Sequence, residues 1–254
     1  MLRVVCPLII FSFDYMKKRT FYILATLLLL ASCYPTDSYL HFVVKITDNI
    51  KAVISINTSP HRRCWSGNEE ITILSEAKEG CTGLYEDVYA ESSYALYPAD
   101  NNATFIDGKI ATVLPEYRDY NAIAEPIMVA QHGNFEEASV MLCINLSSES
   151  DMGQMLKSIT VSSALQSIAG RVEIDCTRDL AMNFVEGGSN SITMTNIDAM
   201  LSAEERRLYI AMPPVAFADD ELCLTFEFES DSYTIALPQL TLERGIMHTV
   251  HCRF

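Results

Sequence analysis

The chain has 254 residues, of which 18 are Lys or Arg and 33 are Asp or Glu, so its formal net charge is −15 at pH 7. A surface this acidic repels phosphate groups, which excludes nucleic acid as an expected partner. The length allows one large domain or two modest domains with buried cores.

The first 33 residues are predicted to be a targeting segment. Residues 16–19 (MKKR) are positively charged, residues 21–31 (FYILATLLLLA) are apolar but too short for a comfortable membrane span, and residues 30–33 (LASC) end the segment with small residues before Cys33. This pattern resembles a bacterial lipoprotein signal with its lipobox. The alternatives are a membrane helix that is kept, or a plain secretion signal.

The lipoprotein pattern implies a signal peptide over residues 1–32, with Met16 as the expected true start. Cleavage before Cys33 would leave a cysteine that carries diacylglycerol and a further acyl chain such as palmitate. Several acyl chains hold a protein at a membrane far better than one, so we expect a stable outer-membrane anchor. The removed segment holds four basic residues and one acidic residue, so the exported part is more acidic than the whole chain.

The remaining six cysteines are even in number, and disulfides are permitted in an exported protein. Four of them lie in apolar, strand-like runs, where a free thiol behaves as a small hydrophobe. Cys64 and Cys81 are the expected pair if any bridge forms. No Cys-x-x-Cys spacing occurs, so the sequence supports no zinc site, and we expect no metal or cofactor.

Short runs rich in β-branched and aromatic residues follow one another along the chain and predict strands. The pair Asp107-Gly108 stands between two apolar runs, which is a strong hairpin signal. In chain order the predicted strands occupy residues 39–46, 52–57, 71–76, 93–98, 104–115, 127–131, 139–146, 156–163, 170–176, 190–196, 206–215, 222–229, 233–239 and 248–254.

Most of these runs alternate apolar and polar residues, as residues 222–229 (LCLTFEFE) do, which is typical of antiparallel sheets with one buried face. Helix signals are few, at Ser202 and in the ambiguous residues 149–156. We therefore predict an all-β protein of two β-sandwich domains, residues 33–134 and 135–254, joined near residues 131–134. A boundary near residue 150 is the alternative.

Residues 95–175 carry a series of motifs that, in this order, resembles the fimbrillin-like family of Bacteroidetes. The motifs are Tyr97-Pro98, a short hairpin, Leu114-Pro115 followed by Tyr117 or Tyr120, Pro126 to Ala130, Ile159 to Ser162, and Gly170. Pro213 and Pro214 after a strand, and the C-terminal residues 245–254, also fit the family. The resemblance covers about residues 40–254.

The resemblance implies two transthyretin-like Greek-key β-sandwiches and a structural, accessory or tip subunit of a cell-surface fimbria that serves adhesion. In such subunits an Arg-specific outer-membrane protease removes the first strand. A strand from a neighbouring subunit then fills the groove that opens in the sheet. In this chain residues 39–57 would be the removable region, and the partners would be other fimbrial subunits, the protease and the outer membrane.

The stretch from Ser59 to Trp65 (SPHRRCW) follows that region and allows several interpretations. His61 could activate Cys64 as a nucleophile, but no orienting Asp or Asn is evident in the sequence. Arg62 and Arg63 could bind an anion, or the loop could simply be solvated. An exposed loop with two arginines also suits proteolysis after Arg63 or Arg62.

The other candidate sites have weaker support. His248 and His251 would point to opposite faces of a strand, so they do not form a metal-binding pair. His132 precedes a glycine and is better explained as a turn residue than as a metal ligand. The acidic run at residues 219–221 lacks the spacing of a calcium loop. The pairs Glu76 with Glu79 and Glu136 with Glu137 have no partner across a cleft, and Trp65 alone gives little basis for a sugar platform.

Three functions remain, ordered by their support from the sequence. The first is a fimbrial subunit without enzymatic activity. The second is a monomeric surface lipoprotein that binds glycan or host protein, and the third is an exported hydrolase, for which no complete set of catalytic residues is evident.

Overall fold

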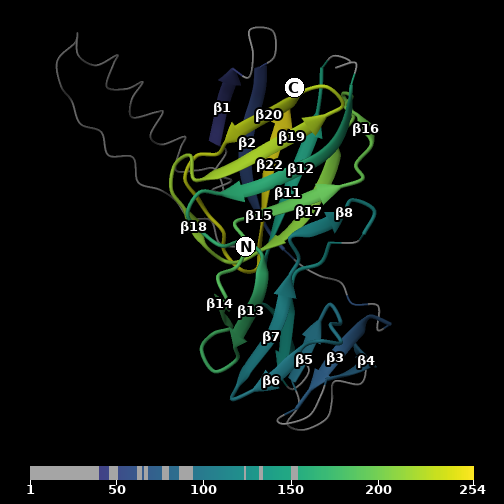
Figure 1. Ribbon diagram of the computed structural model, residues 1–254, viewed down its shortest axis with the longest axis vertical. Helices are drawn as coiled ribbons and strands as arrows, with labels where there is room; N and C mark the ends of the chain where they lie inside the picture. Colours follow the sequence, from purple (N-terminus) through teal and green to yellow (C-terminus); the bar gives the residue numbers. More distant parts are fainter. Residues whose placement is uncertain are drawn as a thin grey trace, which may run out of the picture. The chain divides into compact units, whose positions relative to one another are not determined.

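In the computed structural model the described residues are 40–45, 51–61, 65, 68–75, 80–85, 94–122, 124–131, 134–149 and 154–254; for residues 40–45 and 51–53 only the backbone is described. All regular elements in this part of the chain are β-strands, which confirms the all-β prediction (Figure 1). None of its elements is a helix able to cross a membrane. The predicted signal peptide, the start at Met16 and Cys33 lie outside the described residues.

Two sheets enclose the larger core. The first has the order β1-β2-β22-β11-β17 and the second the order β20-β19-β12-β15-β8, with β16 paired to β12. The strands are β1 (Leu40–Lys45), β2 (Lys51–Pro60), β22 (Ile246–Arg253), β11 (Val140–Ser147), β17 (Arg206–Met212), β20 (Ser232–Ala236), β19 (Leu222–Phe228), β12 (Met155–Ser163), β15 (Ser191–Thr195), β8 (Tyr117–Asp119) and β16 (Ala199–Met200).

The core between these sheets is built by strict alternation. In β19 the side chains of Leu222, Leu224, Phe226 and Phe228 are buried, while the residues between them are half-exposed, as the sequence pattern predicts. The first sheet contributes Ile54, Leu142, Ile144 and Val250 to the same buried cluster. Burial of this apolar surface provides the main stabilisation of the sheet pair.

Two further sheets enclose a second core. Their orders are β10-β9-β5-β3-β4 and β14-β13-β7-β6, and a two-stranded β18-β21 ladder lies elsewhere. The strands are β3 (Glu70–Leu74), β4 (Cys81–Leu84), β5 (Tyr94–Tyr97), β6 (Thr104–Ile106), β7 (Lys109–Leu114), β9 (Met128–Gln131), β10 (Asn134–Glu137), β13 (Gly170–Asp175), β14 (Ala181–Phe184), β18 (Ala216–Phe217) and β21 (Leu240–Thr241).

The predicted hairpin at Asp107-Gly108 is confirmed. Ile106 pairs with Lys109 across a two-residue turn, and both turn residues have positive φ, 51° for Asp107 and 76° for Gly108. This geometry follows the right-handed twist of the flanking strands, and it suits Asp-Gly because these residues tolerate the left-handed region.

Strand pairing links residues on both sides of the expected boundary between residues 134 and 135. β2 pairs with β22, β7 with β13 and β8 with β15. Residues 134–137, which begin at the end of the predicted linker, form β10 and pair with β9. The boundary stays a prediction, and so does the division into two Greek-key domains.

Candidate functional site

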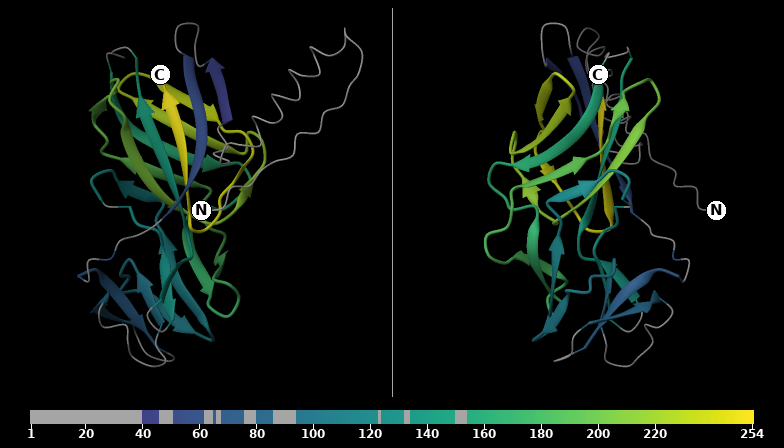
Figure 2. Two further views of the ribbon diagram at one scale, coloured as in Figure 1. Left: turned by 180° about the vertical axis from the view of Figure 1, so that it is seen from behind. Right: turned by 45° about the vertical axis from the view of Figure 1, so that its right-hand side comes forward.

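The strand β2, which precedes the SPHRRCW stretch, lies between β1 and β22. It runs antiparallel to β22 (Figure 2). In the register of this pair, Val53 is opposite Arg253 and Pro60 is opposite Ile246. The sequence predicts this strand to end at Asn57, but pairing with β22 extends it to Pro60. Pro60 lacks an N–H group and stands at the end of the ladder.

The two faces of β2 have different surroundings. Ile54 is fully buried and Ile56 is 3% exposed, and both belong to the larger core. Ser55 and Asn57 point to the outer face of the sheet and are half-buried. β2 therefore contributes one apolar face to the core, and residues 61–65, which the sequence predicts as a loop, follow it in the chain.

His61, at the start of that loop, is held by contacts to two other segments. Its backbone N–H donates to the carbonyl of Gly245 at 2.8 Å, and its Nδ1 contacts Oε1 of Glu137. The second carboxylate oxygen of Glu137 accepts from the N–H of Gly245 at 3.0 Å. The side chain of Glu137 is only 7% exposed, so this group of contacts is largely shielded from water.

Trp65, at the far side of the loop, packs among other aromatic residues. Its ring stacks on Tyr85 with centroids 4.4 Å apart, meets Tyr97 edge-on at 5.1 Å and lies 4.7 Å from Phe135. Such contacts anchor a large side chain well. Because the ring is used within the protein, Trp65 is a packing residue here, consistent with its weak support as a sugar platform.

The predicted site residues of the loop lie outside the described residues. These are Arg62, Arg63 and Cys64, so the cleavage, the anion site and the Cys64–Cys81 bridge stay predictions. Cys81 itself is an exposed thiol whose Sγ lies 3.9 Å from the carbonyl oxygen of Ile73. The sequence offers no orienting group for His61, whereas the structure supplies Glu137, which is 76 residues away and has no local sequence signal.

A polar chain crosses the outer face of the sheet next to β2. His251 Nε2 lies 3.1 Å from Oδ1 of Asn57, and His251 Nδ1 lies 3.0 Å from Nδ2 of Asn145 on β11. The Asn145 side chain also donates to Glu205, which is the main reason why the pKa of Glu205 is lowered. These contacts connect β2, β22 and β11 side by side.

The two C-terminal histidines do lie on opposite faces of β22. His248 is 3% exposed, and its Nε2 accepts the backbone N–H of Glu243 at 3.1 Å. Burial lowers the pKa of His248, so the neutral ring is favoured. His251 lies on the outer face, and the two histidines cannot share a ligand.

The acidic candidates have structural partners. Glu221 is 6% exposed and accepts from the N–H of Ala218 at 2.8 Å and from Oγ of Ser163 at 3.2 Å. Asp219 accepts from the N–H of Gln239 at 2.8 Å. Glu136 and Glu137 alternate along β10 and do not face one another. His132, Glu76 and Glu79 lie outside the described residues.

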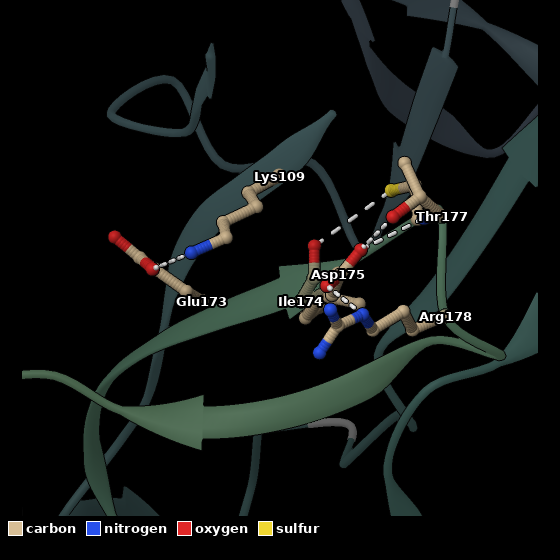
Figure 3. A network of polar contacts seen from close by, with 7 residues as sticks. Lys109, Glu173, Ile174, Asp175, Thr177 and Arg178 are labelled. Carbon is tan, nitrogen blue, oxygen red and sulfur yellow. Dashed lines mark hydrogen bonds and ion pairs between the residues drawn. The ribbon is translucent and has the colours of Figure 1, made fainter. Parts of the chain in front are cut away.

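A second polar cluster lies on the outer face of β7 and β13 (Figure 3). Lys109 Nζ is 3.2 Å from Oε2 of Glu173, and Asp175 Oδ1 accepts from the N–H and the hydroxyl of Thr177 at 2.9 and 2.6 Å. The hydroxyl contact is the main cause that lowers the pKa of Asp175. Asp175 closes a turn, and Glu173 pairs with a lysine on the neighbouring strand. Within the described residues no cluster of three or more His, Cys, Asp or Glu side chains is arranged to hold a metal.

The described cysteines of the strand-like runs are thiols, as expected. Cys143 and Cys252 are buried, and burial raises the pKa of both. Burial also raises the pKa of the half-buried Cys176 to about 11. A thiol with a raised pKa forms little thiolate at neutral pH and is a poor nucleophile.

The sequence matches no family model and no curated protein. Several solved structures are similar in part, among them two from Bacteroides. A candidate cell adhesion protein from Bacteroides ovatus has 15% identity and a TM-score of 0.47, with 75% of this chain and 83% of that chain covered. A candidate cell adhesion protein from Bacteroides uniformis has 12% identity and a TM-score of 0.48, with 75% and 87% covered. Similarity at this level does not assign the chain to a family.

Proposed function

We propose that this chain is a subunit of a bacterial cell-surface fimbria that serves adhesion, exported as an outer-membrane lipoprotein that is anchored through Cys33 until the first strands are removed. In this proposal the chain folds as two Greek-key β-sandwich domains, and subunits join by strand exchange after removal of the first strands. The fimbrillin-like motifs and the lipobox in the sequence support it.

One structural observation carries the proposal: the place of β2. It covers the edge of β22 and inserts Ile54 and Ile56 into the core, yet it continues into the rest of the chain only past the SPHRRCW loop. A cut after Arg63 or Arg62 would detach β1 and β2 together from the covalent chain. Loss of these strands would expose the backbone groups of β22 and an apolar groove, which is the geometry that strand addition needs.

The anchors on both sides of the loop would act on different fragments after a cut. Trp65 is packed against Tyr85 and Phe135, so it would keep the new N-terminal end of the main body in place. His61 is tied to Glu137 and Gly245, so it would hold the end of β2 to the body until a partner strand displaces it.

The test uses the mature chain and an Arg-specific protease. We expect a cut after Arg63 or Arg62, identified by mass spectrometry, followed by ladders in native gels and filaments in electron micrographs. The chain with Arg62→Ala and Arg63→Ala should stay monomeric, and Arg178→Ala, at an exposed arginine in a turn, serves as the matched control. A cut chain that stays monomeric, or an uncut monomer that binds polysaccharide, would contradict the proposal and favour the glycan-binding alternative.

A further inference from the structure

The outer face of β22 contains a histidine whose tautomer is set by its neighbours. The ionised carboxylate of Glu205 only accepts hydrogen bonds, so the Asn145 side chain presents its NH₂ group to it. The same NH₂ group lies 3.0 Å from Nδ1 of His251, which must therefore accept. Nε2 of His251 then carries the proton and donates to Oδ1 of Asn57 at 3.1 Å.

The environment makes this donor sensitive to its partner. Asn145 is 3% exposed, and His251 lies between it and β2 with part of its ring buried. A partly buried hydrogen-bond donor that loses its acceptor costs free energy. A strand beside β22 is therefore favoured when it supplies an acceptor at the position of Asn57.

The position of Asn57 also distinguishes between alternative pairings of β2 with β22 that would bury the same apolar face. A shift of β2 by one residue along β22 would turn Ile54 and Ile56 away from the core. The loss of their burial is enough to disfavour that register. A slip of two residues would keep the same face inward, but it would place Ser55 or Ser59 opposite Thr249, where Asn57 now stands. A serine hydroxyl is shorter than the asparagine amide, and it would not reach His251 in the same way.

We propose that His251 determines the register and the specificity of the strand that lies beside β22. The strand it selects has an apolar residue, any residue, an apolar residue and then an asparagine, and it runs antiparallel to β22. In the intact chain this strand is β2, with Ile54, Ser55, Ile56 and Asn57. For a strand from a partner subunit, the inference rests on the proposed function.

The contact between His251 and Asn57 within one chain is tested on the intact mature chain by a double-mutant cycle. We expect Asn57→Ala and His251→Ala each to lower the folding equilibrium constant about fivefold to tenfold in urea unfolding, and the double variant to lower it by about the same factor. His251→Gln, which keeps an N–H donor, should recover part of the loss. Arg253→Ala, on the same face but paired with Glu149, should not couple to Asn57. Fully additive effects of the two substitutions would overturn the inference.

The selection of a partner strand by His251 is tested on the protease-cut chain with synthetic peptides of residues 51–59. The natural peptide should bind about tenfold more tightly than its Asn57→Ala form, whereas Ser55→Ala should change little. In the chain with His251→Ala the preference for asparagine should disappear. Equal binding of the asparagine and alanine peptides would overturn the inference even if filaments form.

The two failures can be told apart. If the protease does not cut the chain, the proposed function is overturned, and so is the selection of a partner strand by His251. The double-mutant cycle still decides whether His251 and Asn57 interact within one chain. A chain that is cut and forms filaments, but shows no coupling and no peptide preference, keeps the proposed function and removes the role of His251.

Discussion

The two strands that flank β22 carry similar residues and yet have different roles. β2 contains Ile-Ser-Ile-Asn at residues 54–57, and β11 contains Leu-Cys-Ile-Asn at residues 142–145. β11 runs parallel to β22 and is buried at every position from Val140 to Leu146, whereas β2 runs antiparallel and alternates between buried and half-exposed positions.

β2 and β11 differ in what packs against the face that points away from the larger core. The even-numbered residues of β11, such as Leu142 and Ile144, lie in the larger core, while Met141 on the opposite face belongs to the second core. β2 has described residues in the larger core only. β11 contributes to both cores, whereas the described side chains of β2 contribute to one. Under the proposed function, β2 is the strand that a partner strand would replace.

The largest effect is expected from Ile144→Ala in β11. This side chain is fully buried, so its truncation leaves a cavity and should lower the free energy of unfolding by about 2–5 kcal/mol. Urea denaturation should show a single transition at lower denaturant with an unchanged slope. A loss below about 1 kcal/mol would show that β11 is not central to the stability of the fold.

A smaller and more local effect is expected from Ile56→Ala in β2. We expect a loss of about 2 kcal/mol, at the low end for isoleucine truncation, because the strand has only one buried face. Hydrogen exchange should accelerate at the amides of β2 more than at those of β11. Equal acceleration in both strands would mean that β2 does not open separately.

Glu137→Ala should loosen the end of β2. The substitution removes the acceptor of the Gly245 N–H and the contact to His61, and we expect a loss of about 1 kcal/mol. We also expect faster cleavage in the loop by an Arg-specific protease. Glu136→Ala, at the exposed neighbour on the other face of β10, is the matched control, and equal cleavage rates in both variants would contradict the expectation.

The smallest effect concerns acid stability on the outer face. The side chain of Asn145 lowers the pKa of Glu205, so this contact stabilises the fold above the ordinary glutamate pKa and is lost as the pH falls through the lowered value. Asn145→Ala should raise the pKa of Glu205 toward its ordinary value, measured by NMR titration. The variant should therefore lose less stability on acidification than the unchanged chain does.

Sequence patterns predicted the local structure well for particular reasons. The alternation in residues 222–229 and the Asp107-Gly108 turn are local signals, because side-chain direction and turn geometry depend on adjacent residues. Short strands at sheet edges, such as β8 and β14, were not predicted, since they have three or four residues and none of their side chains is fully buried. The role of Glu137 could not be predicted because its contact with His61 spans 76 residues.

The candidate site shows the same division. The sequence pointed to residues 59–65 as a loop with arginines, while the anchors at both ends, Glu137 and the aromatic group around Trp65, became evident only from the structure. The histidine that contacts β2 was weighed in the sequence only as a metal ligand. Its partners Asn57 and Asn145 lie on separate strands, and a single sequence contains no signal that predicts contacts between residues so far apart in the chain.

The sequence by itself determined that the chain is built of strands, which residues face inward in alternating strands such as residues 222–229, and where the predicted lipobox and the paired arginines stand. These follow from period-two alternation and short motifs, which need no distant partner. Only the tertiary structure decided that β2 lies beside β22, almost two hundred residues later, and that β11 is buried on both sides. Backbone hydrogen bonds are the same for every strand, so the choice of neighbour depends on how the whole core packs.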